Sequence, residues 1–338
     1  MNLLLTSVGR RKYIIEYFKK AMTGVGEVHA CNSMETLATQ AADFSFISPK
    51  IYDEAYISTL LGYCKKASIN ALLSLFDVDL LMLAKHRSDF AEIGVKVLLA
   101  DQNSILICND KWKTFQCLEE LGIATPKTYL TLNDAREAIS SSELSYPVIV
   151  KPRWGMASIG VYTVDNEDEM KVLYKRSARK AFESHLKYES TFTPDTAVII
   201  QEKLGGTEHG IDVLNDLEGN YVATWAKKKI AMRAGETDFG EIVSPEPFEG
   251  IARILSEKIR HEALLSVDCF VNGVDILVTE LNCRISGHYP LSHLAGVDLP
   301  RQIIKWLSGE GTDKSLLQCK EGLLIAKDLV PTIFVPTK

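Results

Sequence analysis

Short apolar runs alternate with amphipathic stretches along the first hundred residues. Three consecutive leucines at residues 3–5 predict a buried strand, and a turn follows at residues 7–10. Apolar residues then recur every three to four positions over residues 14–22, which predicts a helix. Further strands are expected at residues 27–30, 70–75 and 95–99, and further helices at residues 56–64 and 80–84. Because strands alternate with helices, we expect a parallel α/β sheet of the Rossmann-like type.

The middle of the chain has a different pattern. Asn109 and Asp110 can cap a helix for which Gly122 is the natural C′ residue, and Pro126 prevents its continuation. Residues 147–150 and 161–164 predict two strands of a hairpin, joined by a glycine-containing loop with a mobile tip at residues 151–160. A basic helix is expected at residues 171–187, followed by a polar loop.

The last third predicts mixed α+β structure. Residues 251–265 have the pattern of a long amphipathic helix, and Asn272 with Gly273 forms a strong hairpin-turn signal. The expected strands are residues 198–200, 211–214, 221–225, 266–271 and 276–281, with a helix at 299–307 and closing strands within 322–335. These patterns divide the chain into predicted domains at residues 1–106, 107–197 and 198–338.

Composition narrows the class of protein. The chain has 338 residues, 46% of them hydrophobic and 24% charged, and its formal net charge is −6. These values are typical of a folded globular protein and exclude disorder or a coiled coil as a description of the whole chain. A mildly acidic chain is a poor candidate for binding nucleic acid. No stretch approaches the ~18 apolar residues that span a membrane, so no membrane partner is expected.

The cysteines and the N-terminus indicate a reducing compartment. The seven cysteines form no C-x-x-C pair, which argues against a disulfide framework and a cysteine-rich zinc site. The N-terminal leucines reach Arg10 too soon to form the apolar region of a signal peptide. We therefore expect a cytoplasmic protein.

Three hard oxygen ligands are expected on one hairpin. Glu280 and Asn282 lie two residues apart on a predicted strand and so face the same way, and Asp268 can join them from the opposite strand. Two carboxylates and an amide oxygen suit Mg²⁺ that also binds substrate phosphates. Alternatively, these side chains face solvent on an edge strand. Arg284 keeps the same face, where it can neutralise a phosphoryl group or form a salt bridge with Glu280.

The loop at residues 151–160 is a candidate phosphate site. Lys151 ends a strand, and Ser158 lies between Gly155 and Gly160, so an ammonium group and exposed backbone N–H groups are close together. The loop is neither a Walker P-loop nor a G-x-S-x-G elbow. An ordinary hairpin connection is the alternative.

Two weaker signals concern nucleotide binding. A strand ends at Gln201, Glu202 and Leu204, where exposed backbone can pair with an adenine edge and Glu208 can bind ribose hydroxyls. A surface turn is the plainer alternative. Lys111 lies in the first turn of its helix, where a positive charge opposes the helix dipole.

A dinucleotide-dependent dehydrogenase is disfavoured. The turn after the first predicted strand contains a single glycine, Gly9, whereas the Rossmann fingerprint needs three glycines to hold the pyrophosphate.

Taken in order, these motifs resemble those of the ATP-grasp superfamily over roughly residues 1–310. The order is a helix-start lysine, Gly-Ile-x-x-Pro at 122–126, a strand-end lysine with its loop, a hinge with a following glutamate, and E-x-N-x-R at 280–284. The loop looks like that of D-alanine–D-alanine ligases, and the E-x-N-x-R string looks like that of carbamoyl-phosphate synthases and biotin carboxylases. The resemblance implies a Rossmann-like domain followed by two lobes that hold ATP between them. The loop departs from the family in having two glycines and a bulky Trp154.

The resemblance also implies a role for each matching residue. Those matching the nucleotide site are the phosphate lysines Lys111 and Lys151, Ser158 of the covering loop, Gln201, Glu202 and Leu204 of the adenine hinge, and Glu208 at the ribose. Asp268, Glu280 and Asn282 match the ligands of Mg²⁺ (or Mn²⁺), and Arg284 matches the arginine beside an acyl phosphate. A further phosphate-binding cation is expected among Lys227, Lys228, Lys229 and Arg233, and we favour Lys229.

The implied function is that of an ATP-dependent carboxylate–amine ligase, which forms an acyl phosphate and then an amide or peptide bond. A non-catalytic ATP-binding regulatory protein is the alternative. The expected partners are a small-molecule carboxylate and amine, and a second copy of the chain in a homodimer. Candidate substrate contacts are Arg10, Arg11, Asp77, Arg233, Glu236, His288 and Tyr289. His288 and His293 are spaced poorly for zinc and are not expected to bind a metal.

Overall fold

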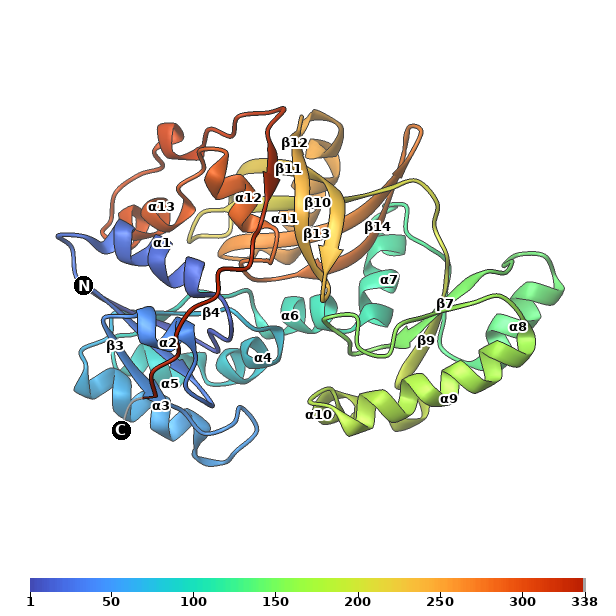
Figure 1. Ribbon diagram of the computed structural model, residues 1–338, viewed down its shortest axis with the longest axis horizontal. Coiled ribbons are helices and arrows are strands. Elements are labelled where there is room, and N and C mark those ends of the chain that lie inside the picture. The colour runs from blue at the N-terminus through green and yellow to red at the C-terminus, as the bar shows by residue number, and fades with distance from the viewer. Residues whose placement is uncertain (337–338) are drawn as a thin grey trace.

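The computed structural model describes residues 1–336, which form three β-sheets with flanking helices (Figure 1). The N-terminal sheet has five parallel strands in the order β3-β2-β1-β4-β5. Its strands are β1 (Asn2–Thr6), β2 (Glu27–Asn32), β3 (Phe44–Ile47), β4 (Ala71–Ser74) and β5 (Lys96–Val97). Its helices are α1 (Lys12–Met22), α2 (Leu37–Ala41), α3 (Ala55–Lys66), α4 (Asp77–Lys85) and α5 (Arg87–Glu92). The parallel α/β prediction is confirmed.

Three apolar residues follow one another in β1 because helices cover both faces of the sheet. Leu3 and Leu5 pack in one hydrophobic cluster with Phe18 of α1, while Leu4 packs in the other cluster with Leu60 of α3. All of these side chains are fully buried. A continuous apolar run is what a parallel strand with helices on both faces requires.

The second sheet has four strands in the order β6-β9-β7-β8, and all of its pairs are antiparallel. The strands are β6 (Thr128–Tyr129), β7 (Val148–Pro152), β8 (Tyr162–Val164) and β9 (Val198–Glu202). The helices before and within this part are α6 (Gln102–Asn109), α7 (Lys111–Glu120), α8 (Leu132–Ser140), α9 (Glu167–Glu183) and α10 (Lys187–Ser190). Because β9 pairs with β6 and β7, this sheet extends to Glu202, beyond the boundary that we expected after residue 197.

The third sheet has six antiparallel strands in the order β14-β13-β10-β11-β12-β15. They are β10 (Thr207–Asn215), β11 (Tyr221–Arg233), β12 (Glu236–Val243), β13 (Ala263–Asn272), β14 (Asp275–Asn282) and β15 (Leu324–Ala326). Helices α11 (Glu249–Ile259), α12 (Tyr289–Leu294) and α13 (Leu299–Leu307) accompany them. One face is apolar and packs on α11 through Ile211, Val213 and Val267.

The other face of this sheet changes character along its length. Where Leu214, Trp225 and Leu264 lie, it packs in the same cluster as α1 and α13. Toward the start of β10, from Asp212 to Glu208, polar side chains replace the apolar ones on this face. The candidate active site begins at this transition.

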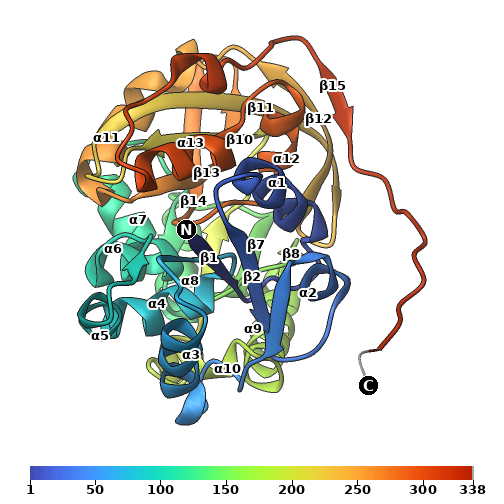
Figure 2. The same ribbon diagram turned by 90° about the vertical axis from the view of Figure 1, so that its left-hand side faces the viewer.

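One expectation about the last third of the chain is wrong, and another is confirmed only in part. The helix expected at 251–265 ends at Ile259, because Arg260 adopts a left-handed conformation with φ +47° and the chain re-enters the sheet at Ala263. Within residues 322–335, only Leu324–Ala326 form a strand. Up to residue 336, the rest of that segment continues from β15 as an extended chain (Figure 2), and around Thr332 it borders α1 and α2. The apolar residues in it gave a strand-like pattern although they pair with no strand.

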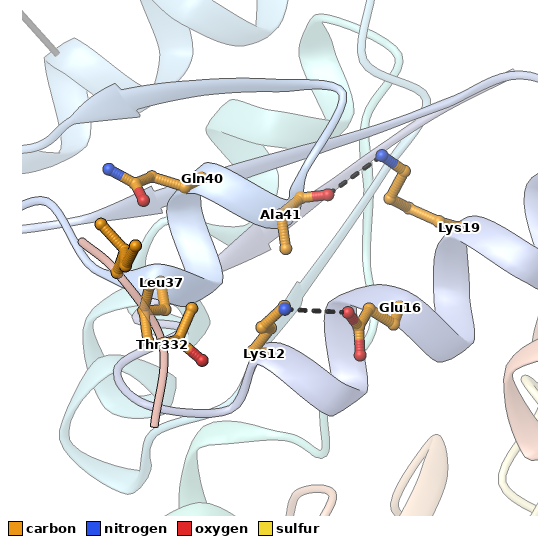
Figure 3. A pocket seen from close by; sticks show the side chains of 8 residues that line it. Lys12, Glu16, Lys19, Leu37, Gln40, Ala41 and Thr332 are labelled. Atoms are coloured by element: carbon orange, nitrogen blue, oxygen red, sulfur yellow. Dashed lines mark hydrogen bonds and ion pairs between the residues drawn. The ribbon is translucent and has the colours of Figure 1, made fainter. Parts of the chain in front are cut away.

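This C-terminal segment borders a cavity of about 440 Å³ between α1 and α2 (Figure 3). Thr332 lies across from Lys12 and Leu37, and the backbone carbonyl of Val335 accepts a hydrogen bond of 2.5 Å from Gln40. None of the predicted site residues lines this cavity. Among residues 1–336, no helix combines the length and hydropathy needed to cross a membrane.

Candidate active site

The predicted metal ligands lie on the polar face of the six-stranded sheet. Asp268 of β13 is the cross-strand partner of Glu280 of β14, and Ser266 is the partner of Asn282. Gly210 of β10 is opposite Asp268, so the polar face continues onto β10. Because directly paired residues share a face, the sheet register brings the two carboxylates and the amide together.

Asp268 and Glu280 each form an ion pair with a lysine from a different element. Lys229 Nζ lies 2.7 Å from Asp268 Oδ1 and 2.7 Å from Glu208 Oε1, and so bridges β10 and β13. Lys111 Nζ lies 3.2 Å from Glu280 Oε1. Lys229 of the basic run is thus the one beside the predicted metal and ribose carboxylates.

The pKa values of Asp268 and Glu280 are shifted in opposite directions. Burial raises the pKa of Asp268, and the neighbouring Glu280 adds to the rise, although Lys229 acts in the opposite direction. Burial would also raise the pKa of Glu280, but Lys111 and Lys151 outweigh it, so the pKa of Glu280 is lowered. Glu280 is therefore the more firmly ionised of the two.

This donor set fits Mg²⁺ rather than a metal held by protein alone. Within residues 1–336, no three His, Cys, Asp or Glu side chains surround a common point. Asp268, Glu280 and Asn282 offer two carboxylates and one amide oxygen, and Mg²⁺ typically takes one or two carboxylates and completes its shell with water and substrate phosphates.

Two lysines approach Glu280 from different parts of the fold. Lys111 begins α7, and its Nζ also donates to the Gly155 carbonyl oxygen at 2.6 Å. Lys151 lies in β7, and its Nζ donates to Gln201 Oε1 at 2.7 Å. Burial lowers the pKa of Lys151 to about 8, and the nearby Lys111 contributes to the shift. An anion bound here would be stabilised by both ammonium groups.

A buried ion pair fixes the start of α7. Asp110 caps the helix by accepting from the Trp112 N–H at 3.0 Å, and it also receives two hydrogen bonds of 2.7 Å from Arg153. The backbone N–H of Lys111 donates to the Arg153 carbonyl at 3.2 Å. Sequence reasoning identified the cap but missed Arg153, because the ion pair joins residues 43 positions apart.

The hinge residues have separate structural roles. Gln201 points inward, and its amide group bonds both Lys151 and Thr128 Oγ1 (2.8 Å). Glu202 Oε2 accepts from the Lys127 N–H at 3.2 Å. Leu204 is half-buried in the connection between β9 and β10. The Gln201 side chain therefore orients Lys151, a contact that the sequence did not suggest.

Ser158 is exposed at the tip of the 151–160 loop. The tip lies against the turn between β11 and β12, where a Cβ on Gly235 would come within 2.7 Å of Ala157 Cα. Trp154 is buried, and its indole N–H donates to Thr193 Oγ1 at 3.1 Å. The bulky Trp154 thus anchors the base of the loop.

Arg284 forms its ion pair with Asp77 of α4 rather than with Glu280. Arg284 Nη2 lies 2.6 Å from Asp77 Oδ2 and 3.3 Å from Asn282 Oδ1. The salt bridge to Glu280 that we considered is therefore not formed. A small cavity of about 20 Å³ lies here, and its lining includes Asp77, Lys111, Gly155, Glu280 and Asn282.

Several candidate substrate contacts lie elsewhere. Arg10 is exposed, and Arg233 pairs with Asp238 at 2.5 Å near the end of the β11–β12 hairpin. Tyr289 is fully buried in the cluster beneath α1 and α13, so it does not line a site.

His288 is also buried, behind the site rather than in it. Its Nε2 lies 2.7 Å from Ser266 Oγ, and its Nδ1 lies 3.2 Å from Asp212 Oδ1. Lys227 is fully buried and forms an ion pair with Asp212. A Cβ on Gly210 would come within 2.8 Å of the His288 ring, so only glycine permits this approach. Asp212, which sequence reasoning missed, is the centre of this network.

Comparisons with known proteins agree with this architecture. Residues 3–98 match the N-terminal domain of PylC-like proteins, and residues 108–288 match the ATP-grasp domain. The carbamoyl phosphate synthase arginine-specific large chain of Bacillus subtilis is 20% identical over 288 residues, which is 82% of this chain and 26% of that protein. Biotin carboxylase of Halalkalibacterium halodurans is 24% identical over 292 residues, 82% of this chain and 63% of that protein.

Solved structures share the fold. The L-amino acid ligase of Bacillus licheniformis superposes with a TM-score of 0.72 at 16% identity, covering 95% of this chain and 78% of that chain. Biotin carboxylase of Campylobacter jejuni, in complex with a β,γ-ATP ligand, gives 0.72 at 18% identity, covering 94% and 73%. The chain spans about a quarter of the carbamoyl phosphate synthase large chains that it matches. Since the ATP-grasp domain match covers more than half of the residues, the chain belongs to the ATP-grasp family.

Proposed function

We propose that this protein is an ATP-dependent ligase that activates a carboxylate as an acyl phosphate and joins it to an amine. The observation that supports this most directly is the pair of facing carboxylates, Asp268 and Glu280, each bonded to a lysine from another element. Lys151 and Arg284 add two more cations near Glu280. Such a mixed cluster of acidic and basic groups suits a metal-bound triphosphate.

The nucleotide would lie between the two antiparallel sheets. Lys111 and Lys151 would bind triphosphate oxygens, Glu202 and Leu204 would contact adenine through their backbone, and Glu208 would accept the ribose hydroxyls. Asp268, Glu280 and Asn282 would hold Mg²⁺ or Mn²⁺, which supplies neutralisation of phosphate charge when bound. In exchange for their present partners, the lysines would gain phosphate oxygens.

The chemistry requires positioning and charge neutralisation rather than a protein nucleophile. A carboxylate oxygen of the substrate attacks the γ-phosphorus of ATP, the bond to the β-phosphate oxygen breaks, and ADP leaves. The amine then attacks the acyl carbon, phosphate leaves, and the amine loses a proton. Arg284 and Lys229 would stabilise the negative charge during these steps. The 151–160 loop, with Ser158 at its tip, would cover the phosphates and exclude water.

The test is ADP release by the purified protein with Mg²⁺, ATP and a panel of carboxylic acids and amines. We expect ADP release that requires both an acid and Mg²⁺. ATP binding without ADP release for any combination, and with the same affinity in Glu280→Gln, would favour the regulatory alternative.

We further propose that the protein binds small-molecule acids and amines, that it is located in the cytoplasm, and that it forms a homodimer. A biotin carboxylase domain from Hydrogenobacter thermophilus is described as a dimer in complex with MgADP, at a TM-score of 0.73 and 15% identity. Light scattering of the purified chain would give its mass in solution and test the dimer.

A further inference from the structure

Two cysteines from distant parts of the chain lie in contact beside the candidate active site. Cys108 is near the end of α6, and Cys283 directly follows β14. Their Sγ atoms are 3.1 Å apart, although 175 positions separate them in the sequence. Both thiols are free, and the two residues are only 3% and 6% exposed. The contact joins the segment that leads into α7 to the hairpin that carries the proposed metal ligands.

The neighbours of both cysteines are predicted site residues. Cys283 lies between Asn282 and Arg284, whose side chains are 3.3 Å apart. Cys108 precedes Lys111, the first residue of α7, by three positions. A change in the distance between the two sulfurs therefore acts on residues at both sides of the site.

Cys108 faces the small cavity at the site. It belongs to the lining of the cavity of about 20 Å³, together with Lys111 and Asn282. Cys283 contacts Cys108 but is not part of that lining. A volume of this size admits one molecule about as large as water. Hydrogen peroxide is little larger than water, so it can reach Cys108 where a bulky oxidant cannot.

We propose that Cys108 and Cys283 form a reversible disulfide when the protein meets a hydroperoxide small enough to enter this cavity. The sulfur of Cys108 attacks a peroxide oxygen, the O–O bond breaks, and the departing oxygen takes up the thiol proton and leaves as water. The sulfur of Cys283 then attacks the resulting sulfenic acid, the S–O bond breaks, and a second water leaves with the remaining thiol proton. The two thiols lose two electrons in all, and these reduce one peroxide to two waters.

Burial keeps the thiols free until the concentration of peroxide rises. It raises the pKa of Cys108, and the contact with Cys283 adds to the rise. The thiolate is the form that attacks an oxidant, so a raised pKa slows the first step. The pair therefore responds to concentrated rather than trace peroxide.

The disulfide changes the geometry at the site. A disulfide bond is about 2.0 Å long, so the two sulfurs must approach one another by about 1 Å. Because Asn282 and Arg284 flank Cys283, this movement displaces both, and a misplacement of about 1 Å can lower turnover ~100-fold. This effect on turnover rests on the proposed ligase function, whereas the disulfide itself does not.

The experiment is peptide mapping of the full chain after treatment with millimolar hydrogen peroxide and alkylation of the remaining thiols. We expect one main cross-linked species, which joins the peptides that carry Cys108 and Cys283 and which dithiothreitol reverses. Absence of this cross-link, or a preference for other cysteine pairs, overturns the proposal.

A bulkier oxidant tests the route through the cavity. tert-Butyl hydroperoxide offers the same O–O bond but exceeds the cavity in size. When each rate is divided by the rate of the same peroxide with free cysteine, we expect cross-linking to be at least ~10-fold slower with this oxidant. Equal relative rates would contradict access to Cys108 through the cavity.

Variants test the effect on the site. In the wild type, ADP release should fall ~10-fold or more after peroxide and return after dithiothreitol. Cys108→Ala removes the thiol that faces the cavity and should lose this sensitivity. Cys319→Ala is the control, because it removes the more accessible, half-buried thiol and should remain as sensitive as the wild type. An equal loss of ADP release in Cys108→Ala and the wild type would count against the proposal.

These outcomes separate the two proposals. A cross-link between Cys108 and Cys283 in a protein that never releases ADP would support the disulfide and contradict the ligase. ADP release by a protein that peroxide leaves without this cross-link would do the reverse.

Discussion

Asp268 and Glu280 face one another across the β13–β14 hairpin, and each is neutralised by a lysine from outside it. Lys229 comes from β11 and Lys111 from the start of α7. Two like charges in direct opposition are destabilising unless cations compensate them. This alternation of acidic and basic groups is what the proposed function requires, since a metal-bound triphosphate carries both a cation and phosphate anions.

Replacement of Glu280 by glutamine should abolish turnover. The amide keeps the shape of the side chain but removes one charge from the proposed metal site, and loss of several kcal/mol of charge stabilisation corresponds to a fall of ~100-fold or more in ADP release. Asp275→Asn is the control, because Asp275 is exposed at the other end of the same strand. Activity of Glu280→Gln within a few-fold of the wild type would contradict the assignment.

MgATP affinity should fall as the pH rises through about 8. The pKa of Lys151 is lowered to about 8 in the free protein, chiefly by burial. Above that pH the amine is neutral, and binding of phosphate must then take up a proton, so affinity decreases by up to ~10-fold per pH unit. Calorimetry between pH 6.5 and 9.5 checks this.

The same group affects folding in the opposite direction. Because the unfolded chain holds this proton up to a pH of about 10.4, the contribution of Lys151 to the free energy of unfolding rises between pH 8 and that value.

The variant Lys151→Met should bind MgATP weakly at every pH, and its MgATP affinity should no longer change near pH 8. A pH dependence that persists in Lys151→Met would assign it to another group.

Replacement of Arg153 by methionine should destabilise the fold. Asp110 is fully buried and would be left without its ion-pair partner, which typically costs about 3–5 kcal/mol in the free energy of unfolding. Arg136→Met is the control, since its ion pair with Glu167 is partly exposed and should contribute less than about 1 kcal/mol. Urea denaturation measures both. Equal losses in the two variants would show that the buried pair has no special role.

Lys229→Met should make the protein depend on divalent metal for stability. It leaves Glu208 and Asp268 without their shared cation. We expect a lower melting temperature that millimolar Mg²⁺ partly restores, with a larger Mg²⁺ effect than in the wild type. Lys228→Met, whose side chain lies on the opposite face of β11, should show neither effect. A Lys229→Met protein insensitive to Mg²⁺ would argue against a metal at Asp268.

The sequence predicted the elements and residues that depend on local pattern. The leucine run of β1, the Asn272-Gly273 turn and the shared face of Glu280 and Asn282 all follow from short-range periodicity. The end of α11 at Ile259 was missed, because the helical pattern continues into β13 and a left-handed Arg260 has no distinct signal.

The contacts that shape the site were mostly not predictable. Arg284 pairs with Asp77 across 207 positions, and Arg11 pairs with Glu236 across 225. Such pairs depend on how the N-terminal sheet docks on the six-stranded sheet, and a single sequence carries no signal for that. The predicted residues of the hairpin could be found because they are neighbours in the sheet register, whereas their partners could not.

If this site transfers the γ-phosphoryl group of ATP to a carboxylate, hydroxylamine can trap the resulting acyl phosphate without knowledge of the natural amine. The protein is incubated with MgATP, hydroxylamine and each acid of a panel, and hydroxamate and ADP are both measured. We expect at least one acid to give hydroxamate and ADP in equal amounts, and Glu280→Gln to give neither. MgATP binding with no hydroxamate and no ADP from any acid would contradict it.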